Sequence, residues 1–336
     1  MLIPPKYRLT NKISELLSSI EASKEVIDSL TLHPKIEMNI RRESTLKSSL
    51  YSARIEGNPL TLNEIIGKVS QNQKKLEIFN ILKALNLVRE KGDSNLTTKD
   101  ILTYHKIIIN GLGNSGTPGL PAGRQGKFRS NMEAIFNSAG IAIYMPPPPS
   151  MISSLIDRLI KYTNNLKERF IPIRAVLTHY SFEKIHPFLD GSGRVGRLLI
   201  QRILFQGGYG MKGIIPLEEY LDLHRSEYYR MLEEPEKDAT DYIEFMLEAI
   251  AETAKKAKLE ILAKQEPNVE NMLLPRRAEI YRIVKEQKMV NFDRIRRRFA
   301  QVNERTLRYD LKSLQDEKLI RKLGTTKGVY YTPNEF

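Results

Sequence analysis

The chain has 336 residues, of which 41% are hydrophobic and 28% are charged, a composition typical of a soluble protein with two or three domains. It contains no cysteine, which excludes disulfides, thiolate metal sites and cysteine nucleophiles, and its net charge of +13 favours anionic partners such as nucleotides or nucleic acid. No apolar run approaches the roughly 20 residues that span a bilayer and the start lacks a signal-peptide pattern, so we expect a cytoplasmic protein without membrane contact.

The first quarter of the chain is predicted to be helical. Apolar residues recur at helical spacing through residues 12–30, and Pro34 is expected to end that helix. Residues 37–56 and 61–90 predict two further helices, and the second begins with a capping-box pattern.

The composition of the chain changes after residue 110, where glycine and proline become frequent. A helix is expected to begin at Thr98, and residues 111–126, which include six glycines and two prolines, must then form a loop. Residues 134–144 predict a β-hairpin, with two short apolar strands around Asn137-Ser-Ala-Gly140. The proline run 146–149 closes it as a stiff extended segment.

Helical periodicity then resumes and continues almost to the C-terminal region. The predicted helices cover residues 151–170, 173–185, 198–206, 217–233 and 238–264. After the last of these helices, Glu266-Pro-Asn268 is predicted to be a linker to the C-terminal region.

One segment carries several chemical groups at close spacing, namely His186-Pro-Phe-Leu-Asp-Gly-Ser-Gly-Arg-Val-Gly-Arg197, hereafter the motif. Glycines before a helix start let backbone N–H groups point at an anion, and the helix dipole assists. Arg194 and Arg197 share a face of that first turn and can clamp phosphate oxygens. His186 is a candidate general base and Asp190 a candidate Mg²⁺ ligand. These are the parts that phosphoryl-type transfer requires.

The motif closely resembles the signature of the Fic family, His-Pro-Phe-x-(Asp/Glu)-Gly-Asn-Gly-Arg-x-x-Arg. Every fixed position matches except one, because Ser192 stands where Asn is usual. Gly126-Lys-Phe-Arg129 and the hairpin after it resemble the flap region of these proteins, so the resemblance covers most of residues 1–250. It implies a mostly α fold: a Fic-type helical bundle with a small β-hairpin flap.

The resemblance implies protein adenylylation, in which AMP moves from ATP to a hydroxyl of a target protein. His186 would deprotonate the target Ser, Thr or Tyr, and Asp190 would bind Mg²⁺ at the phosphates. A phosphotransferase branch of the family has Lys at the position of Gly193, so glycine favours AMP transfer over phosphate transfer. The residues expected to bind ATP are Gly191, Ser192, Gly193, Arg194, Val195, Gly196, Arg197 and Tyr229. We expect Ser192 to retain or reduce activity, since Ser and Asn both favour turns.

A second pattern, Ser52-Ala-Arg-Ile-Glu-Gly-Asn58, resembles the inhibitory motif of the family. Its glutamate would pair with Arg197 and remove that guanidinium from the γ-phosphate, since a carboxylate and a phosphate compete for it. Ser52 lies four residues before Glu56, hence on the same helix face. In some relatives this glutamate aligns water for AMP removal, so the reverse reaction is also expected. An ordinary helix end with an exposed glutamate is the alternative.

Other candidates are less specific. Tyr229 resembles an aromatic that borders the adenine pocket, although an aromatic in an amphipathic helix is as easily core. The flap, residues 134–144, is expected to bind an extended segment of the target by strand addition. His105, His179 and His224 lack metal-ligand spacing and are interpreted as structural or exposed. A homodimer also remains open.

The C-terminal segment, residues 275–336, contains 16 Lys and Arg against 8 Asp and Glu, so it carries +8 of the total charge. Its pattern of three helices and a hairpin, at residues 276–288, 292–299, 303–318 and 319–332, resembles a winged helix-turn-helix domain. The residues expected to contact DNA are Arg305, Thr306 and Arg308. A protein-contact or dimerisation module is the alternative.

The predicted organisation therefore has four parts: residues 1–96, a helical region with the inhibitory motif; 97–250, a Fic catalytic domain; 251–274, a helix and linker; and 275–336, a winged helix-turn-helix domain. The favoured function is a protein adenylyltransferase that uses ATP and Mg²⁺ and is restrained by Glu56. The alternative is a DNA-binding regulator whose Fic-like domain mainly senses nucleotide.

Overall fold

Two compact units make up the chain in the computed structural model. It describes residues 1–65, 72–91, 94–113, 125–136, 142–165, 167–233, 238–264, 269–325 and 328–334. The first unit comprises residues 1–30, 43–60 and 69–259, and the second comprises residues 31–42, 61–68 and 260–336. Each is described by itself.

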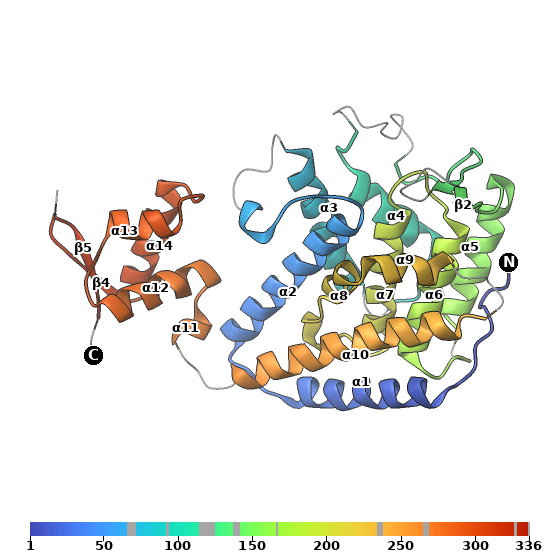
Figure 1. The fold of residues 1–336 in the computed structure, drawn as a ribbon, viewed down its shortest axis with the longest axis horizontal. Helices are drawn as coiled ribbons and strands as arrows, with labels where there is room; N and C mark the ends of the chain where they lie inside the picture. Colours follow the sequence, from blue (N-terminus) through green and yellow to red (C-terminus); the bar gives the residue numbers. More distant parts are fainter. Residues whose placement is uncertain are drawn as a thin grey trace. The chain divides into compact units, whose positions relative to one another are not determined.

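Helices dominate both units, as the sequence predicted (Figure 1). The elements before the C-terminal region are α1 (Asn11–Ser29), α2 (Pro34–Ile55), η1 (Leu62–Glu64), α3 (Gln73–Glu90), α4 (Thr98–Ile109), β1 (Ile135–Phe136), β2 (Ala142–Tyr144), α5 (Pro149–Thr163), α6 (Ile171–Ile185), α7 (Ser192–Gln206), η2 (Met211–Gly213), α8 (Leu217–Leu223), α9 (Arg225–Glu233) and α10 (Thr240–Ala263). In the described part of the chain, no helix is long and apolar enough to cross a membrane.

Helices α6 and α7 form the centre of the first unit. Every residue of α6 from Pro172 to Ile185 is buried, its polar and charged residues included, so neighbours cover the helix on all sides. Helix α7 packs closely against it at Gly196, where a Cβ atom would lie only 2.0 Å from the Glu183 carboxylate. The motif connects these two helices, so both of its ends are fixed by the core.

The flap predicted at residues 134–144 is present as an antiparallel pair of strands. Ile135 pairs with Tyr144, and Phe136 pairs with Ala142. The expected turn at residues 137–140 lies outside the described residues, as does most of the expected loop at residues 111–126. The hairpin is attached to α6, because the Tyr144 hydroxyl donates a hydrogen bond to the backbone carbonyl of Lys184 at 2.8 Å.

Three helix predictions are wrong at their ends. Helix α5 stops at Thr163 instead of residue 170, because the next side chain, Asn164, hydrogen-bonds both backbone groups of Leu96. Residues 217–233 form two helices, which are separated by the non-helical backbone of His224. Pro34 does not end the first helix but starts α2, where a missing N–H costs nothing.

The helix predicted at residues 61–90 is also divided. The capping box is present, but it begins only the short turn η1, in which Thr61 and Glu64 satisfy each other. Helix α3 starts later, at Gln73, where the Asn72 side chain accepts hydrogen bonds from two backbone N–H groups of the first turn. Residues 66–71 lie outside the described residues.

The second unit contains the three helices and the hairpin predicted for the C-terminal segment, together with a short helix and a short strand that the sequence did not predict. These are α11 (Val269–Met272), α12 (Pro275–Gln287), β3 (Val290–Asn291), α13 (Phe292–Arg298), α14 (Glu304–Asp316), β4 (Ile320–Leu323) and β5 (Tyr330–Pro333). The strands form an antiparallel sheet in the order β3-β5-β4. The predicted apolar stripe of α14 is buried in the core at Leu307, Leu311 and Leu314. The linker expected at residues 266–268 lies outside the described residues.

Candidate active site

The motif makes a tight turn between α6 and α7 because two of its residues adopt left-handed backbone conformations. His186 ends α6 with φ 45°, and Gly191 precedes α7 with φ 84°. Glycine adopts this conformation freely, but histidine does so at a cost, and such strain in non-glycine residues concentrates at functional sites. A side chain at Gly191 would also lie 3.0 Å from Ile109.

Ser192, the one departure from the family signature, holds the turn through its hydroxyl group. Its Oγ accepts a hydrogen bond from the backbone N–H of Phe188 and donates one to the carbonyl of the same residue, both at 3.1 Å. The side chain is buried. The turn therefore keeps both backbone groups of Phe188 satisfied with serine in place of asparagine.

His186 is suited to accept a proton at neutral pH. Burial lowers its pKa to about 4, and the Arg129 charge acts in the same direction, against the opposing charges of Glu56 and Asp190. The imidazole is therefore neutral at pH 7, which is the form that a general base requires.

Arg197 is buried, and its guanidinium is hydrogen-bonded by Ser52 and Glu56, the two residues of the predicted inhibitory motif. Its Nε donates to the Ser52 hydroxyl at 3.0 Å, and its Nη2 donates to the Ser52 carbonyl at 2.9 Å. The same Nη2 donates to Glu56 Oε1 at 2.8 Å. The sequence pattern from Ser52 to Glu56 therefore does meet the second arginine of the motif.

The Glu56–Arg197 ion pair fits only because residue 193 has no side chain. A Cβ atom at Gly193 would lie 2.5 Å from Glu56 Oε1 and 3.1 Å from an Arg197 nitrogen. Burial on its own would raise the pKa of Glu56, but the nearby Arg197 and Arg194 charges lower it below its usual range. Glu56 is therefore ionised at neutral pH, and its full negative charge would compete with a phosphate for the Arg197 guanidinium.

Tyr229 is not a core residue, so that interpretation is excluded, and its place beside the adenine stays a prediction. It is 39% exposed, and its hydroxyl donates to the carbonyl of Ile55 at 3.1 Å, directly before Glu56. The buried aromatic of this helix is instead Tyr228, whose hydroxyl hydrogen-bonds His179 Nε2 at 3.0 Å.

Arg194 is held by two carboxylates, one of which the sequence did not reveal. Asp190 pairs with its Nη2, as the spacing of four residues allows, and Glu77 Oε1 of α3 lies 2.5 Å from its Nη1. Asn58 donates a hydrogen bond to the other Glu77 oxygen at 2.9 Å. Hence the turn that carries Glu56 also supports the carboxylate that holds Arg194.

His105 is a supporting residue beneath the motif. Its ring stacks on Phe188 with the centroids 3.8 Å apart. The backbone N–H of Gly126 donates to its Nδ1, so its Nε2 carries the proton and donates to the Asp190 carbonyl at 3.1 Å. The interpretation of His105 and His179 as structural and His224 as exposed is confirmed.

The remaining motif residues differ in their exposure to solvent. Val195 and Gly196 face the core, whereas Gly193 is partly exposed and Asp190 has a side chain that is 49% exposed. No cluster of three or more His, Asp or Glu side chains suited to a metal occurs within the described residues. Solvent therefore reaches Asp190, which is the carboxylate of the motif.

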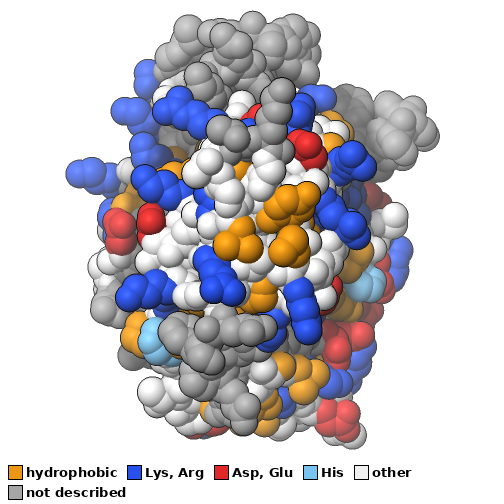
Figure 2. Space-filling view, turned by 90° about the vertical axis from the view of Figure 1, so that its left-hand side faces the viewer, with side chains coloured by type: hydrophobic (Ala, Val, Ile, Leu, Met, Phe, Trp, Pro, Cys, Tyr) orange, Lys and Arg blue, Asp and Glu red, His pale blue; other side chains and the backbone are white. Residues whose placement is uncertain are grey.

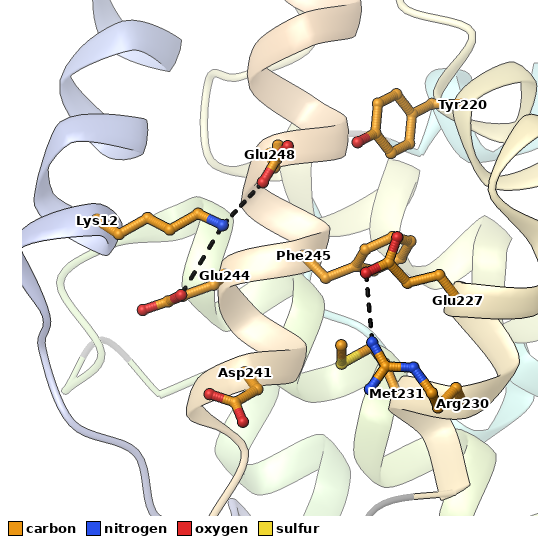
Figure 3. Close-up of a pocket in the computed structure, with 9 residues that line it drawn as sticks. All are labelled: Lys12, Tyr220, Glu227, Arg230, Met231, Asp241, Glu244, Phe245 and Glu248. Carbon is orange, nitrogen blue, oxygen red and sulfur yellow. Dashed lines mark hydrogen bonds and ion pairs between the residues drawn. The ribbon is translucent and has the colours of Figure 1, made fainter.

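A separate pocket of about 330 Å³ lies between α1, α8, α9 and α10 (Figure 3). Its lining includes four carboxylates, and its two basic groups are already engaged, Lys12 with Glu248 at 2.9 Å and Arg230 with Glu227 at 3.4 Å. An excess of negative charge repels phosphate groups. The pocket is therefore unsuited to a nucleotide.

The second unit offers a basic surface. Figure 2 shows Lys and Arg side chains around an exposed hydrophobic group. Arg305 on α14 is exposed and, within the described part of the chain, has no acidic partner. Arg308 is engaged by Glu304 at 3.7 Å and by the ring of Phe292 at 4.0 Å, and Thr306 is half-buried. Of the three predicted DNA contacts, Arg305 is the most available.

Comparison with known proteins agrees with this geometry. Residues 95–204 match the model of the Fic/DOC family. The proteins named protein adenylyltransferase Fic from Drosophila mojavensis and Drosophila melanogaster are each 25% identical over 250 residues, which cover 70% of this chain. The match covers 46% and 47% of those proteins, so the chain spans about half their length.

Solved structures resemble the chain over a larger part of its length. A Fic family protein from Desulfovibrio desulfuricans G20 matches with a TM-score of 0.64 and 24% identity, over 98% of both chains. Fic-1 from C. elegans matches with a TM-score of 0.57 and 18% identity, over 75% of this chain and 72% of that one. The chain therefore has the predicted Fic-type fold, and residues 95–204 form a Fic domain.

Proposed function

We propose that the protein is an adenylyltransferase that moves AMP from ATP to a hydroxyl group of a protein. The observation that carries this proposal is the neutral His186 at a strained turn, directly before the N-terminus of α7, with Arg194 and Arg197 in the first two turns of that helix. A base and a cluster of anion-binding groups meet there, as nucleotidyl transfer requires.

In the proposed reaction, His186 accepts the proton of the target hydroxyl as its oxygen attacks the α-phosphorus. The new bond joins that oxygen to AMP, and the bond to the β-phosphate oxygen breaks, so pyrophosphate leaves. The N-terminal N–H groups of α7 and the guanidinium groups of Arg194 and Arg197 would stabilise the phosphate charge. Gly193 leaves the approach to these groups open, since it has no side chain.

Asp190 would hold Mg²⁺, the metal that this chemistry uses. Its carboxylate is a hard oxygen ligand, is exposed and belongs to the same turn as the phosphate-binding groups. The metal would neutralise phosphate charge when it is bound.

Glu56 would restrain the reaction. It occupies the guanidinium of Arg197 at 2.8 Å, so a γ-phosphate must displace it to bind there. The enzyme would then be largely inactive until α2 and the following turn shift. We also assign Glu56 to the reverse reaction, in which its carboxylate would orient the water that removes AMP from a modified target.

ATP with a radioactive label at either the α- or the γ-phosphate tests the proposal. The Glu56→Gly variant should incorporate α-label into itself or added protein, and Glu56→Gly with His186→Ala should not. Incorporation of γ-label instead would identify a kinase-like reaction. Absence of both labels at saturating ATP and Mg²⁺ would contradict the proposal.

A second candidate function is DNA binding by the second unit. Arg305 on α14, which is exposed and has no acidic partner among the residues that the structure describes, and the basic surface of Figure 2 favour it. In a mobility-shift experiment at low salt, Arg305→Ala in the full chain should weaken binding. Lys24→Ala on α1, which removes a lysine already paired with Glu25 at 3.0 Å, should not. A full chain that binds no DNA at low salt would end this candidate.

A further inference from the structure

Arg129, in the segment before the flap, makes an unusual set of hydrogen bonds for a buried arginine. Its Nε donates to the backbone carbonyl of His186 at 2.8 Å, and its Nη1 donates to that of Asn131 at 2.9 Å. Its Nη2 donates to the carbonyl of Pro147, and its backbone N–H donates to that of Pro187 at 2.9 Å. The residue is only 3% exposed.

Two of these acceptors flank the flap, and the other two belong to the start of the motif. Asn131 precedes β1 and Pro147 follows β2, so the guanidinium closes the base of the flap. His186 and Pro187 form the strained turn at the end of α6. One rigid, planar fork therefore joins the two segments, and a lysine could not satisfy three carbonyls in this plane.

The charge of Arg129 also matters at this place. Carbonyl groups at the C-terminal end of a helix carry partial negative charge, which a cation stabilises. Burial lowers the pKa of Arg129, and Glu133 at 3.6 Å offsets part of that effect. In turn, the Arg129 charge contributes to the low pKa of His186.

We propose that Arg129 is a positioning residue that holds the main chain of His186 in register with the flap, so that the base meets the hydroxyl of a target segment bound there. The proposal rests on the proposed adenylyltransferase function. The guanidinium of Arg129 donates to the carbonyls of His186, Asn131 and Pro147, and none of these carbonyls is proposed to bind phosphate. Its loss should therefore slow transfer and leave nucleotide affinity unchanged, because misplacing reacting groups lowers the rate constant.

The test compares variants of the full chain that also carry Glu56→Gly. Arg129→Lys should lower the rate of α-label incorporation about tenfold or more, while the Kd for ATP stays within about twofold. Arg174→Lys is the matched control, because Arg174 is equally buried but lies at the opposite end of α6. It should leave the rate unchanged.

Arg129→Gln adds a second measurement, the pH dependence of the rate, which a purely structural role of Arg129 would not change. Without the charge, the pKa of His186 should rise, so the acidic limb of the pH–rate profile should move to higher pH. Arg129→Lys, which keeps the charge, should leave the limb where it is. A rate unchanged in Arg129→Lys, or a loss of ATP affinity as large as the loss of rate, would overturn the proposal.

Tyr144→Phe decides the case if both Arg129 variants fail to fold. It removes the second hydrogen bond between the flap and α6, at the carbonyl of Lys184, and changes no charge. It should slow transfer at constant ATP affinity, and an unchanged rate would contradict the proposal. If Glu56→Gly alone incorporates no α-label, the proposed function fails. If Glu56→Gly is active and the Arg129 variants match it, only the role of Arg129 fails.

Discussion

Glu56 and Arg197 lie 141 residues apart in the sequence, yet their side chains form an ion pair of 2.8 Å next to Gly193, at the start of α7. The pair is supported by Ser52 on one side and by the absence of a side chain at Gly193 on the other. In the proposed function the γ-phosphate of ATP needs the same guanidinium, so the strength of this pair would set how readily the site accepts ATP.

Glu56→Gln should raise AMP incorporation by about tenfold, since a neutral amide competes with phosphate less well than a carboxylate. The rate of α-label incorporation measures this effect. Glu43→Gln provides a matched control, because Glu43 lies on the same helix and pairs with Lys47 at 2.9 Å instead of with the motif. Equal rates for the wild-type protein and Glu56→Gln would show that the ion pair does not restrain transfer.

Glu77→Gln should increase ATP affinity several-fold, because it removes a carboxylate that lies 2.5 Å from Arg194 and repels phosphate. Titration calorimetry with ATP and Mg²⁺ measures the Kd. The increase should persist when Glu56→Gly is also present, since the two carboxylates hold different arginines. Weaker binding would instead show that Glu77 positions Arg194 for the phosphate.

Glu183→Gln should change how stability depends on pH. Burial raises the pKa of Glu183 from 4.5 to about 8, so the folded protein holds a proton that the unfolded chain releases above pH 4.5. Its contribution to stability is therefore present at low pH and falls by ~1.4 kcal/mol per pH unit until about pH 8.

The depressed pKa values of the buried histidines act below pH 6.5, in the opposite direction, so the effect of Glu183 should be clearest between pH 6.5 and 8. Denaturant unfolding across this range should show a smaller loss of stability for Glu183→Gln than for the wild-type protein. Parallel curves for the two proteins would mean that Glu183 is ionised when folded.

Gly196→Ala should destabilise the first unit by about 1–3 kcal/mol, because the added methyl group overlaps the Glu183 carboxylate between α6 and α7. Thermal unfolding measures this change. Gly328→Ala is a suitable control, since a Cβ atom there would meet no neighbour within 4 Å. An unchanged melting temperature for Gly196→Ala would require α6 and α7 to separate without cost.

Local patterns explain why much of the fold could be predicted. Helical periodicity located α1, α6 and α10, and the proline and glycine positions located the flap, because these signals act over a few residues. One error occurred where a distant group competes with the helix. Asn164 leaves the helical pattern to bind the backbone of Leu96, and no local signal reports that partner.

The sequence by itself determined the motif from His186 to Arg197, because its groups are close along the chain and a turn between two helices must bring them together. It also predicted that Glu56 pairs with Arg197, because the residues around Glu56 resemble the inhibitory motif of the Fic family. Only the tertiary structure decided which side chains support these groups. Glu77 reaches Arg194 across 117 residues, and Arg129 reaches the His186 carbonyl across 57. Such contacts depend on how helices pack, which side-chain spacing along the chain does not specify.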